Sequence, residues 1–197
     1  MSIQINYKNS FSEKSPANLV IFTDENFNID GLKKHISNTE FSYISDLLKT
    51  SDLKKDLLFF EVNSKKTIFL VSAKEKIEAS DIESLGAEFH GYINYDKKSE
   101  YFVNSDSIND KLENFLGHFL HGLKLKSYEF SIYKSKKDTK LITINVIGNN
   151  NKTTAQNELR FRAIEKGTFF ARDLVSEPPN VLNPKEYANR LLKLKRF

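Results

Sequence analysis

Two histidines stand three residues apart in a stretch that is predicted to be helical. His118 and His121 have the i, i+3 spacing, which can bring two imidazoles to one side of a helix and onto one metal ion. A third ligand does not follow nearby, and the chain holds 4 His and no Cys. Two interpretations stay open: a metal site, and the favoured one, with one histidine at the edge of the core and one facing solvent.

Acidic residues on another predicted helix are candidates for general acid–base chemistry. Asp81, Glu83, Glu88 and His90 lie on or near it, and carboxylates and imidazoles are the usual proton-transfer groups of enzymes. Their polar surroundings favour a solvated helix face over a catalytic cluster. No serine stands in a G-x-S-x-G elbow, and the absence of cysteine excludes a thiolate nucleophile and disulfides.

Phosphate-binding loops need glycines so that backbone N–H groups can approach the anion. The chain has 7 Gly, with no G-x-G and no P-loop pattern. The polar loop from Gly148 to Lys152 lies between a predicted strand and a predicted helix, and we interpret it as a turn at the edge of a domain. We therefore expect no tight binding of a mononucleotide or of ADP-ribose.

Two small basic clusters could contact nucleic-acid phosphates. The first contains Lys134, Lys136 and Lys137, and the second lies at the end of the chain, over 193–196. Clusters of this size usually keep a surface soluble, and the net charge of +4 comes from 30 basic and 26 acidic residues that are mostly interspersed. If the first cluster meets DNA, the binding should be weak, tolerant of sequence and steeply dependent on salt.

The composition indicates a soluble, well-cored protein. The 197 residues include 39% hydrophobic residues, with 16 Phe and 8 Tyr, and 28% charged residues. The mean hydropathy is −0.49. No apolar run reaches the length of a membrane span, and the N-terminus lacks a basic stretch followed by an apolar one. We expect a cytoplasmic protein with no membrane partner.

The hydrophobic pattern predicts strands that alternate with helices. Short apolar or β-branched runs predict strands, whereas apolar residues at steps of three and four predict amphipathic helices. The expected strands are 19–22, 57–62, 67–71, 101–103 and 141–147, with further alternation over 128–133, and the expected helices are 80–95, 108–123 and 154–175. Ser80 to Glu83 has the spacing of a capping box, and Gly122 suits a helix end.

This order of elements predicts an α/β fold: a mixed β-sheet flanked by helices, followed by a long linker helix. The linker helix should begin at the capping-box spacing of Thr153 and Gln156 and end before Pro178, whose ring cannot continue it. Its apolar stripe is expected at Leu159, Ala163, Gly167, Ala171 and Leu174.

The end of this helix carries a specific resemblance. From Ala171 to Pro184 the chain runs Ala-Arg-Asp-Leu-Val-Ser-Glu-Pro-Pro-Asn-Val-Leu-Asn-Pro, which resembles the domain junction of the leucyl aminopeptidase family of two-metal cytosol aminopeptidases. A second stretch, Gly122 to Lys137, has the pattern Gly-Leu-x-Leu-x-x-Tyr-x-Phe-x-x-Tyr-Lys-Ser-Lys-Lys. It is similar to the segment that closes the last large helix of that family's N-terminal domain.

The resemblance implies a macro-like N-terminal domain over 1–150, a linker helix over 151–177, and a truncated start of the catalytic domain over 178–197. Members of the family hydrolyse the N-terminal residue of peptides with two divalent ions, typically zinc or manganese, assemble as homohexamers, and in some cases have a regulatory role on DNA.

The family's glycine-flanked metal-binding Lys motif and its Asn-Thr-Asp-Ala-Glu-Gly-Arg motif have no counterpart in this sequence. The resemblance therefore implies a fragment with no catalytic residue and no metal or other cofactor of its own, which would partner the catalytic domain of the full-length protein. The alternative is a freestanding macro-like module that binds a nucleotide or a nucleic acid.

Overall fold

A six-stranded mixed β-sheet forms the centre of the computed structural model, which describes residues 2–8, 18–109, 113–135 and 140–194. The strands are β1 (Ser2–Lys8), β2 (Asn18–Thr23), β3 (Leu57–Asn63), β4 (Lys66–Ser72), β5 (Glu100–Asn104) and β6 (Leu141–Ile147). Their order in the sheet is β1-β6-β5-β2-β4-β3. All neighbouring strands are parallel except the antiparallel pair of β3 and β4.

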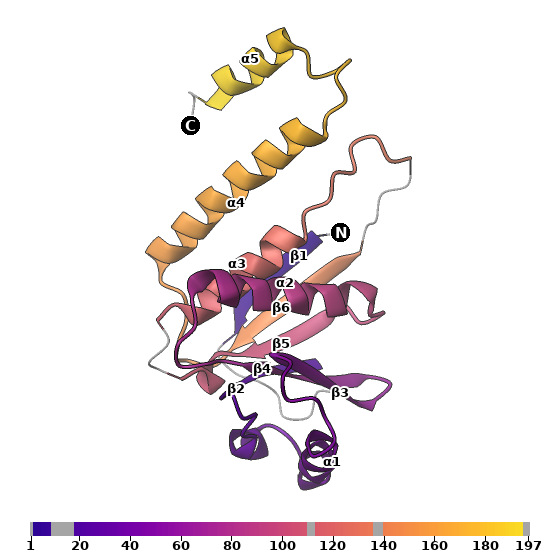
Figure 1. The fold of residues 1–197 in the computed structure, drawn as a ribbon, viewed down its shortest axis with the longest axis vertical. Coiled ribbons are helices and arrows are strands. Elements are labelled where there is room, and N and C mark those ends of the chain that lie inside the picture. Colours follow the sequence, from indigo (N-terminus) through magenta and orange to yellow (C-terminus); the bar gives the residue numbers. More distant parts are fainter. Residues whose placement is uncertain (1, 9–17, 110–112, 136–139, 195–197) are drawn as a thin grey trace.

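Helices cover both faces of this sheet (Figure 1). They are η1 (Asp30–Lys34), α1 (Asn38–Leu48), α2 (Ala79–Tyr95), η2 (Ser105–Ser107), α3 (Phe115–Lys126), α4 (Ala155–Ser176) and α5 (Pro184–Leu194). Helices α2 and α3 pack on one face, whereas η1 and α1 pack on the other. The predicted α/β class, a mixed sheet flanked by helices and followed by a long helix, is confirmed.

The strands form where the sequence is most apolar. Every residue of β2 is buried, because β2 lies between β4 and β5 and both of its faces are covered. The predicted hairpin is confirmed as β3 and β4. Strand β6 is also confirmed, whereas β1 was not predicted, although Ile3, Ile5 and Tyr7 alternate with polar residues as in a half-buried edge strand.

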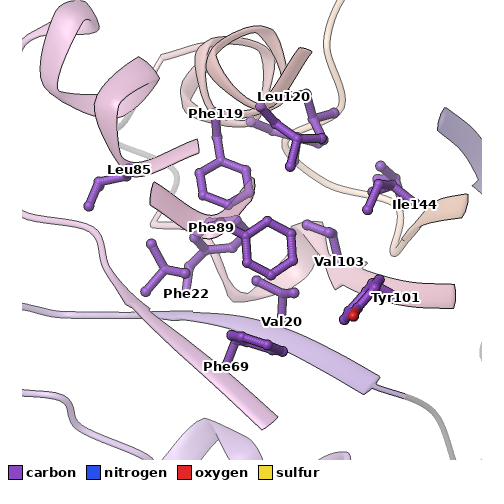
Figure 2. Close-up of a cluster of buried hydrophobic side chains, with 14 of the residues drawn as sticks. Val20, Phe22, Phe69, Leu85, Phe89, Tyr101, Val103, Phe119, Leu120 and Ile144 are labelled. Atoms are coloured by element: carbon purple, nitrogen blue, oxygen red, sulfur yellow. The ribbon is translucent and has the colours of Figure 1, made fainter. Parts of the chain in front are cut away.

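Aromatic rings fill the core between the sheet and the two helices α2 and α3 (Figure 2). Phe22 meets Phe119 edge-to-face, with 5.2 Å between ring centroids and 89° between planes, and Phe69 meets Phe89 at 5.1 Å and 85°. Each such pair contributes about 0.5–1.5 kcal/mol beyond its buried area. These contacts join strands β2 and β4 to helices α2 and α3 in one cluster.

Helices α2 and α3 touch through glycines. A Cβ added to Gly86 would lie 1.9 Å from the carbonyl oxygen of Phe119, and one added to Gly122 would lie 1.9 Å from that of Glu83. The prediction that Gly122 ends its helix is wrong, because α3 continues to Lys126. Gly122 instead allows the two backbones to approach. The predicted start at Ile108 is also wrong, since α3 begins at Phe115.

The predicted starts of α2 and α4 are correct to within a residue or two, but their caps differ. Helix α2 is preceded by Glu78 without a side-chain cap, so the predicted box at Ser80 is wrong. Helix α4 is capped by Thr154, whose Oγ1 accepts the N–H of Asn157 at 3.3 Å, and not by Thr153. The alternating stretch 128–133 forms no strand.

Helix α4 runs across the outside of α3 (Figure 1). None of its residues is fully buried. The side that meets α3 carries Phe161, whereas the predicted apolar stripe is largely exposed, with Leu159 at 67%. Within the part of the chain that the structure describes, no helix combines the length and apolar content needed to cross a membrane.

Candidate functional site

The two stretches that carry the family resemblance lie against one another. Tyr128, just after α3, donates its hydroxyl to Asp173 of α4 at 2.7 Å. Arg172 donates to the backbone carbonyl of Leu125 at 2.5 Å and lies over the Tyr128 ring, 5.5 Å from its centroid. The ring of Tyr128 also packs on Phe169 at 5.2 Å. The motif residues Arg172 and Asp173 therefore fix the long helix to the end of α3.

A second set of contacts holds the turn that follows α4. The carboxylate of Glu177 accepts the Tyr133 hydroxyl and lies 2.9 Å from Nη1 of Arg190 in α5, which also binds Glu186 at 3.1 Å. These two donors, Tyr133 first, lower the pKa of Glu177. Only 3% of the Glu177 side chain is exposed. Glu177 thus ties the Pro178 turn to the elements on both sides of it.

His118 and His121 converge on a single carboxylate. Nδ1 of His118 lies 3.1 Å and Nδ1 of His121 lies 3.0 Å from the same oxygen, Oε1 of Glu83 on α2. Partial burial alone would raise the pKa of Glu83, but the hydrogen bonds from the two histidines outweigh it, and the pKa is lowered. The expected solvated face is thus wrong for Glu83, and also for His90, which is buried.

A metal site at His118 and His121 stays a prediction without a third ligand among the described residues. Across residues 2–8, 18–109, 113–135 and 140–194, no three His, Cys, Asp or Glu side chains are grouped so that they could hold a metal ion. Both Nδ1 atoms are engaged with Glu83. The described residues therefore do not fit the two-metal site that the family resemblance implies for the full-length protein.

The polar loop after β6 already holds an internal anion. The N–H groups of Asn149 and Asn150 donate to Oδ1 of Asp106 at 2.9 and 2.7 Å. Gly148 has φ 110°, and an added Cβ would lie 2.6 Å from the Ser105 hydroxyl. The amides that an external phosphate would need are thus occupied by a carboxylate of the chain itself.

The basic cluster is only partly described. Lys134 forms an ion pair with Glu129, and this contact is the largest of the causes that lower the pKa of Glu129 to about 2. Lys136 and Lys137 lie outside the described residues. Contact of this cluster with DNA stays a prediction.

A cleft of about 500 Å³ opens between β1, α3 and α4. Ile3 and Ile5 of β1, Leu120 and His121 of α3, and Phe161 of α4 form much of its wall. Phe161 packs on the ring of His121 at 4.8 Å. The Nε2 atom of His121 is buried and has no hydrogen-bond partner among the described residues. Sequence reasoning did not find this cleft, since it depends on how α4 lies over β1.

Sequence comparison finds relatives among the cytosol aminopeptidases. No family model matches the chain. A probable cytosol aminopeptidase from Methylobacterium radiotolerans is 38% identical over 86 residues, covering 41% of this chain and 17% of that protein. Another, from Nitrobacter winogradskyi, is 25% identical over 211 residues, covering 94% of this chain and 40% of that protein. The predicted resemblance to the leucyl aminopeptidase family is confirmed.

Solved structures agree on the fold. A tomato leucine aminopeptidase mutant matches with a TM-score of 0.69 and 18% identity over 98% of this chain and 42% of that one. The bottromycin maturation enzyme BotP in complex with Mn matches at 0.61, with 11% identity over 92% of this chain and 36% of that one. The chain thus spans no more than about two fifths of these aminopeptidases and their structural neighbours.

Proposed function

We propose that this chain is the N-terminal, non-catalytic portion of a leucyl aminopeptidase. The full-length protein would be a cytoplasmic hydrolase that releases N-terminal amino acids, preferentially leucine, from peptides. One observation carries the proposal: Asp173 and Glu177 of the junction motif bind Tyr128 and Tyr133 of the second family-like stretch. The residues that resemble the family are thus those that hold the linker helix in place.

The proposed organisation is an N-terminal domain over 1–150, a linker helix over 151–177, and the start of a catalytic domain over 178–197. The exposed apolar residues of the last two helices support it. On α4, Leu159 is 67% and Val175 is 87% exposed, and on α5 Leu192 is 55% exposed. A following domain would cover such surfaces. The same proposal includes the assembly of the full-length protein into a homohexamer.

The chemistry would belong to the catalytic domain. Two divalent ions, manganese or zinc, would activate a water molecule and polarise the scissile carbonyl there. The structural neighbour BotP is in complex with Mn, which supports this choice of metal. The role of the present chain is to position the linker helix and the Pro178 turn from which that domain would continue.

The alternative of a freestanding nucleotide- or nucleic-acid-binding module has less support. Asp106 fills the amide cradle after β6, and Lys134 is engaged with Glu129. An external phosphate would have to displace a carboxylate at either place.

The coding sequence beyond Phe197 tests the proposal. We expect an open reading frame that continues into a glycine-flanked Lys motif and an Asn-Thr-Asp-Ala-Glu-Gly-Arg motif. A stop codon directly after Phe197 in the native transcript would contradict the proposal and favour the freestanding module.

A further inference from the structure

The cleft between β1, α3 and α4 exposes the edge of the sheet. Among the strands that the structure describes, β1 pairs with β6 alone. The N–H of Ser2 points to β6, where it donates to Lys140, so the alternation of a strand directs the backbone groups of Ile3, Ile5 and Tyr7 to the free edge. Lys124 confirms this direction by donating to the carbonyl oxygen of Ile3 at 2.6 Å. The backbone of Ile5 and Tyr7 thus faces the cleft.

In the wall of this cleft, His121 has a buried ring nitrogen that lacks a hydrogen-bond partner among the described residues. His121 is 5% exposed, its Nδ1 lies 3.0 Å from Oε1 of Glu83, and its Nε2 is buried within the cleft wall without a hydrogen-bond partner among the described residues. The surrounding wall is apolar, with Ile5, Leu120 and Phe161. An apolar cleft of this size with a few convergent polar groups is the usual form of a ligand site.

The α4 wall of the cleft carries charges of both signs. Glu158, Arg162, Glu165 and Lys166 follow one another at helical spacing along it. Glu158 hydrogen-bonds Tyr7 at the carboxyl end of β1, and burial together with this contact raises the pKa of Tyr7 to about 12. From there α4 runs back toward the amino end of β1 (Figure 1). A ligand along β1 would thus have Glu158, which lies 3.8 Å from Arg162, at one end and the neighbouring Glu165 and Lys166 at the other.

We propose that this cleft binds a short extended peptide with apolar side chains, which adds to β1 as an antiparallel strand. Lys166 follows Glu158 by eight positions, a rise of about 12 Å along the helix, and an extended tripeptide spans about 10 Å. The ammonium group lies at Glu158, the carboxylate lies at Lys166, and the apolar side chains pack on Ile5, Leu120 and Phe161. Main-chain hydrogen bonds to Ile5 and Tyr7 supply an affinity that depends little on the sequence of the peptide. This site is separate from the peptidase activity proposed for the full-length protein.

Titration of the ¹⁵N-labelled chain with trileucine, followed by amide chemical shifts, tests the proposal. Saturable shifts are expected at Ile5 and Tyr7, with a Kd on the order of 0.1–1 mM. Lys166→Glu should weaken binding about tenfold, because it places a negative side chain beside the terminal carboxylate of the peptide. Lys185→Glu, the same charge change on α5, is the matched control and should leave Kd unchanged. Because both residues are exposed, neither change should unfold the chain.

Two further ligands test the contributions of the terminal carboxylate and of the peptide's length. Trileucine amide lacks the terminal carboxylate and should bind both wild type and Lys166→Glu with the weakened affinity. Free leucine cannot reach from Glu158 to Lys166 and should bind at least about tenfold more weakly than the tripeptide. The proposal is overturned if trileucine produces no saturable shifts, if free leucine binds at the same residues with the same Kd, or if Lys166→Glu behaves like Lys185→Glu.

Discussion

The contact of α2 with α3 leaves no room for one methyl group. In Gly86→Ala, the new Cβ would start 1.9 Å from the carbonyl oxygen of Phe119 and 2.9 Å from the N–H nitrogen of Leu123. Both obstacles are backbone atoms, so no side-chain rotation relieves the clash. Gly91 lies on the same helix and has nothing within 4 Å of an added Cβ. Gly91→Ala is therefore a matched control with the same chemical change.

The expected loss of folding stability follows from the distance by which the two helices must separate. A Cβ needs at least 3.0 Å, so the helices must move apart by more than 1 Å at Gly86. A gap of that size forfeits about half of each dispersion contact that it opens, and overpacking of a core costs about 1–3 kcal/mol, occasionally more. Alanine is also the better helix former by about 1 kcal/mol. With overpacking at the upper end of that range and the gain in helix propensity subtracted, we expect Gly86→Ala to lose about 2 kcal/mol and Gly91→Ala to gain about 0.5–1 kcal/mol.

Urea unfolding followed by far-UV circular dichroism measures both variants. The urea midpoints of the two variants should move in opposite directions. The slope of the free energy of unfolding against urea concentration should stay the same, since the surface exposed on unfolding is the same. Gly122→Ala, whose Cβ would meet Glu83 at 1.9 Å, should behave like Gly86→Ala. If Gly86→Ala is as stable as Gly91→Ala, the close packing described for α2 and α3 is wrong.

Three single contacts can be tested by similar means. The histidines hold the pKa of Glu83 below its usual 4.5. The contribution of Glu83 to stability is therefore present above pH 4.5 and is lost as the pH falls through the folded-state pKa. The difference in urea midpoint between wild type and Glu83→Gln should shrink over that pH range. Asp106→Ala frees the two loop amides after β6, which should exchange with solvent at least about tenfold faster by NMR. Tyr128→Phe removes the hydroxyl bound to Asp173 and should cost about 1 kcal/mol in urea unfolding, whereas Tyr43→Phe, which is 46% exposed, should cost almost nothing.

Local pattern predicted the elements that lie inside the fold. Strand β2 and the β3–β4 hairpin are continuous apolar runs, and α4 is bounded by Thr154 and Pro178. Prediction failed where contacts between distant segments determine the local structure. The stretch 128–133 alternates like a strand, but its tyrosines are used by α4 and by Glu177 instead of by a sheet. Gly122 has the composition of a helix end and serves as a packing site.

The candidate sites were less visible in the sequence, because their partners are distant. Glu83 lies 35 and 38 residues from the two histidines that it binds, and no spacing rule connects them. The cleft depends on β1, whose alternation of Ile3, Ile5 and Tyr7 was a detectable signal, and on α4, whose contact side carries Phe161 among charged residues. The spacing of apolar residues instead indicated the opposite, exposed side of α4.

The central claim is that this chain is the non-catalytic portion of an aminopeptidase, and hydrolysis of leucine p-nitroanilide tests it most directly. The 197-residue chain and the same chain extended through a complete second domain should be purified and assayed side by side with manganese or zinc. We predict turnover only by the extended protein, and its loss on addition of a chelator, because the proposed function assigns the metal ligands to that second domain. Chelator-sensitive turnover by the 197-residue chain, or an inactive extended protein, would contradict the claim.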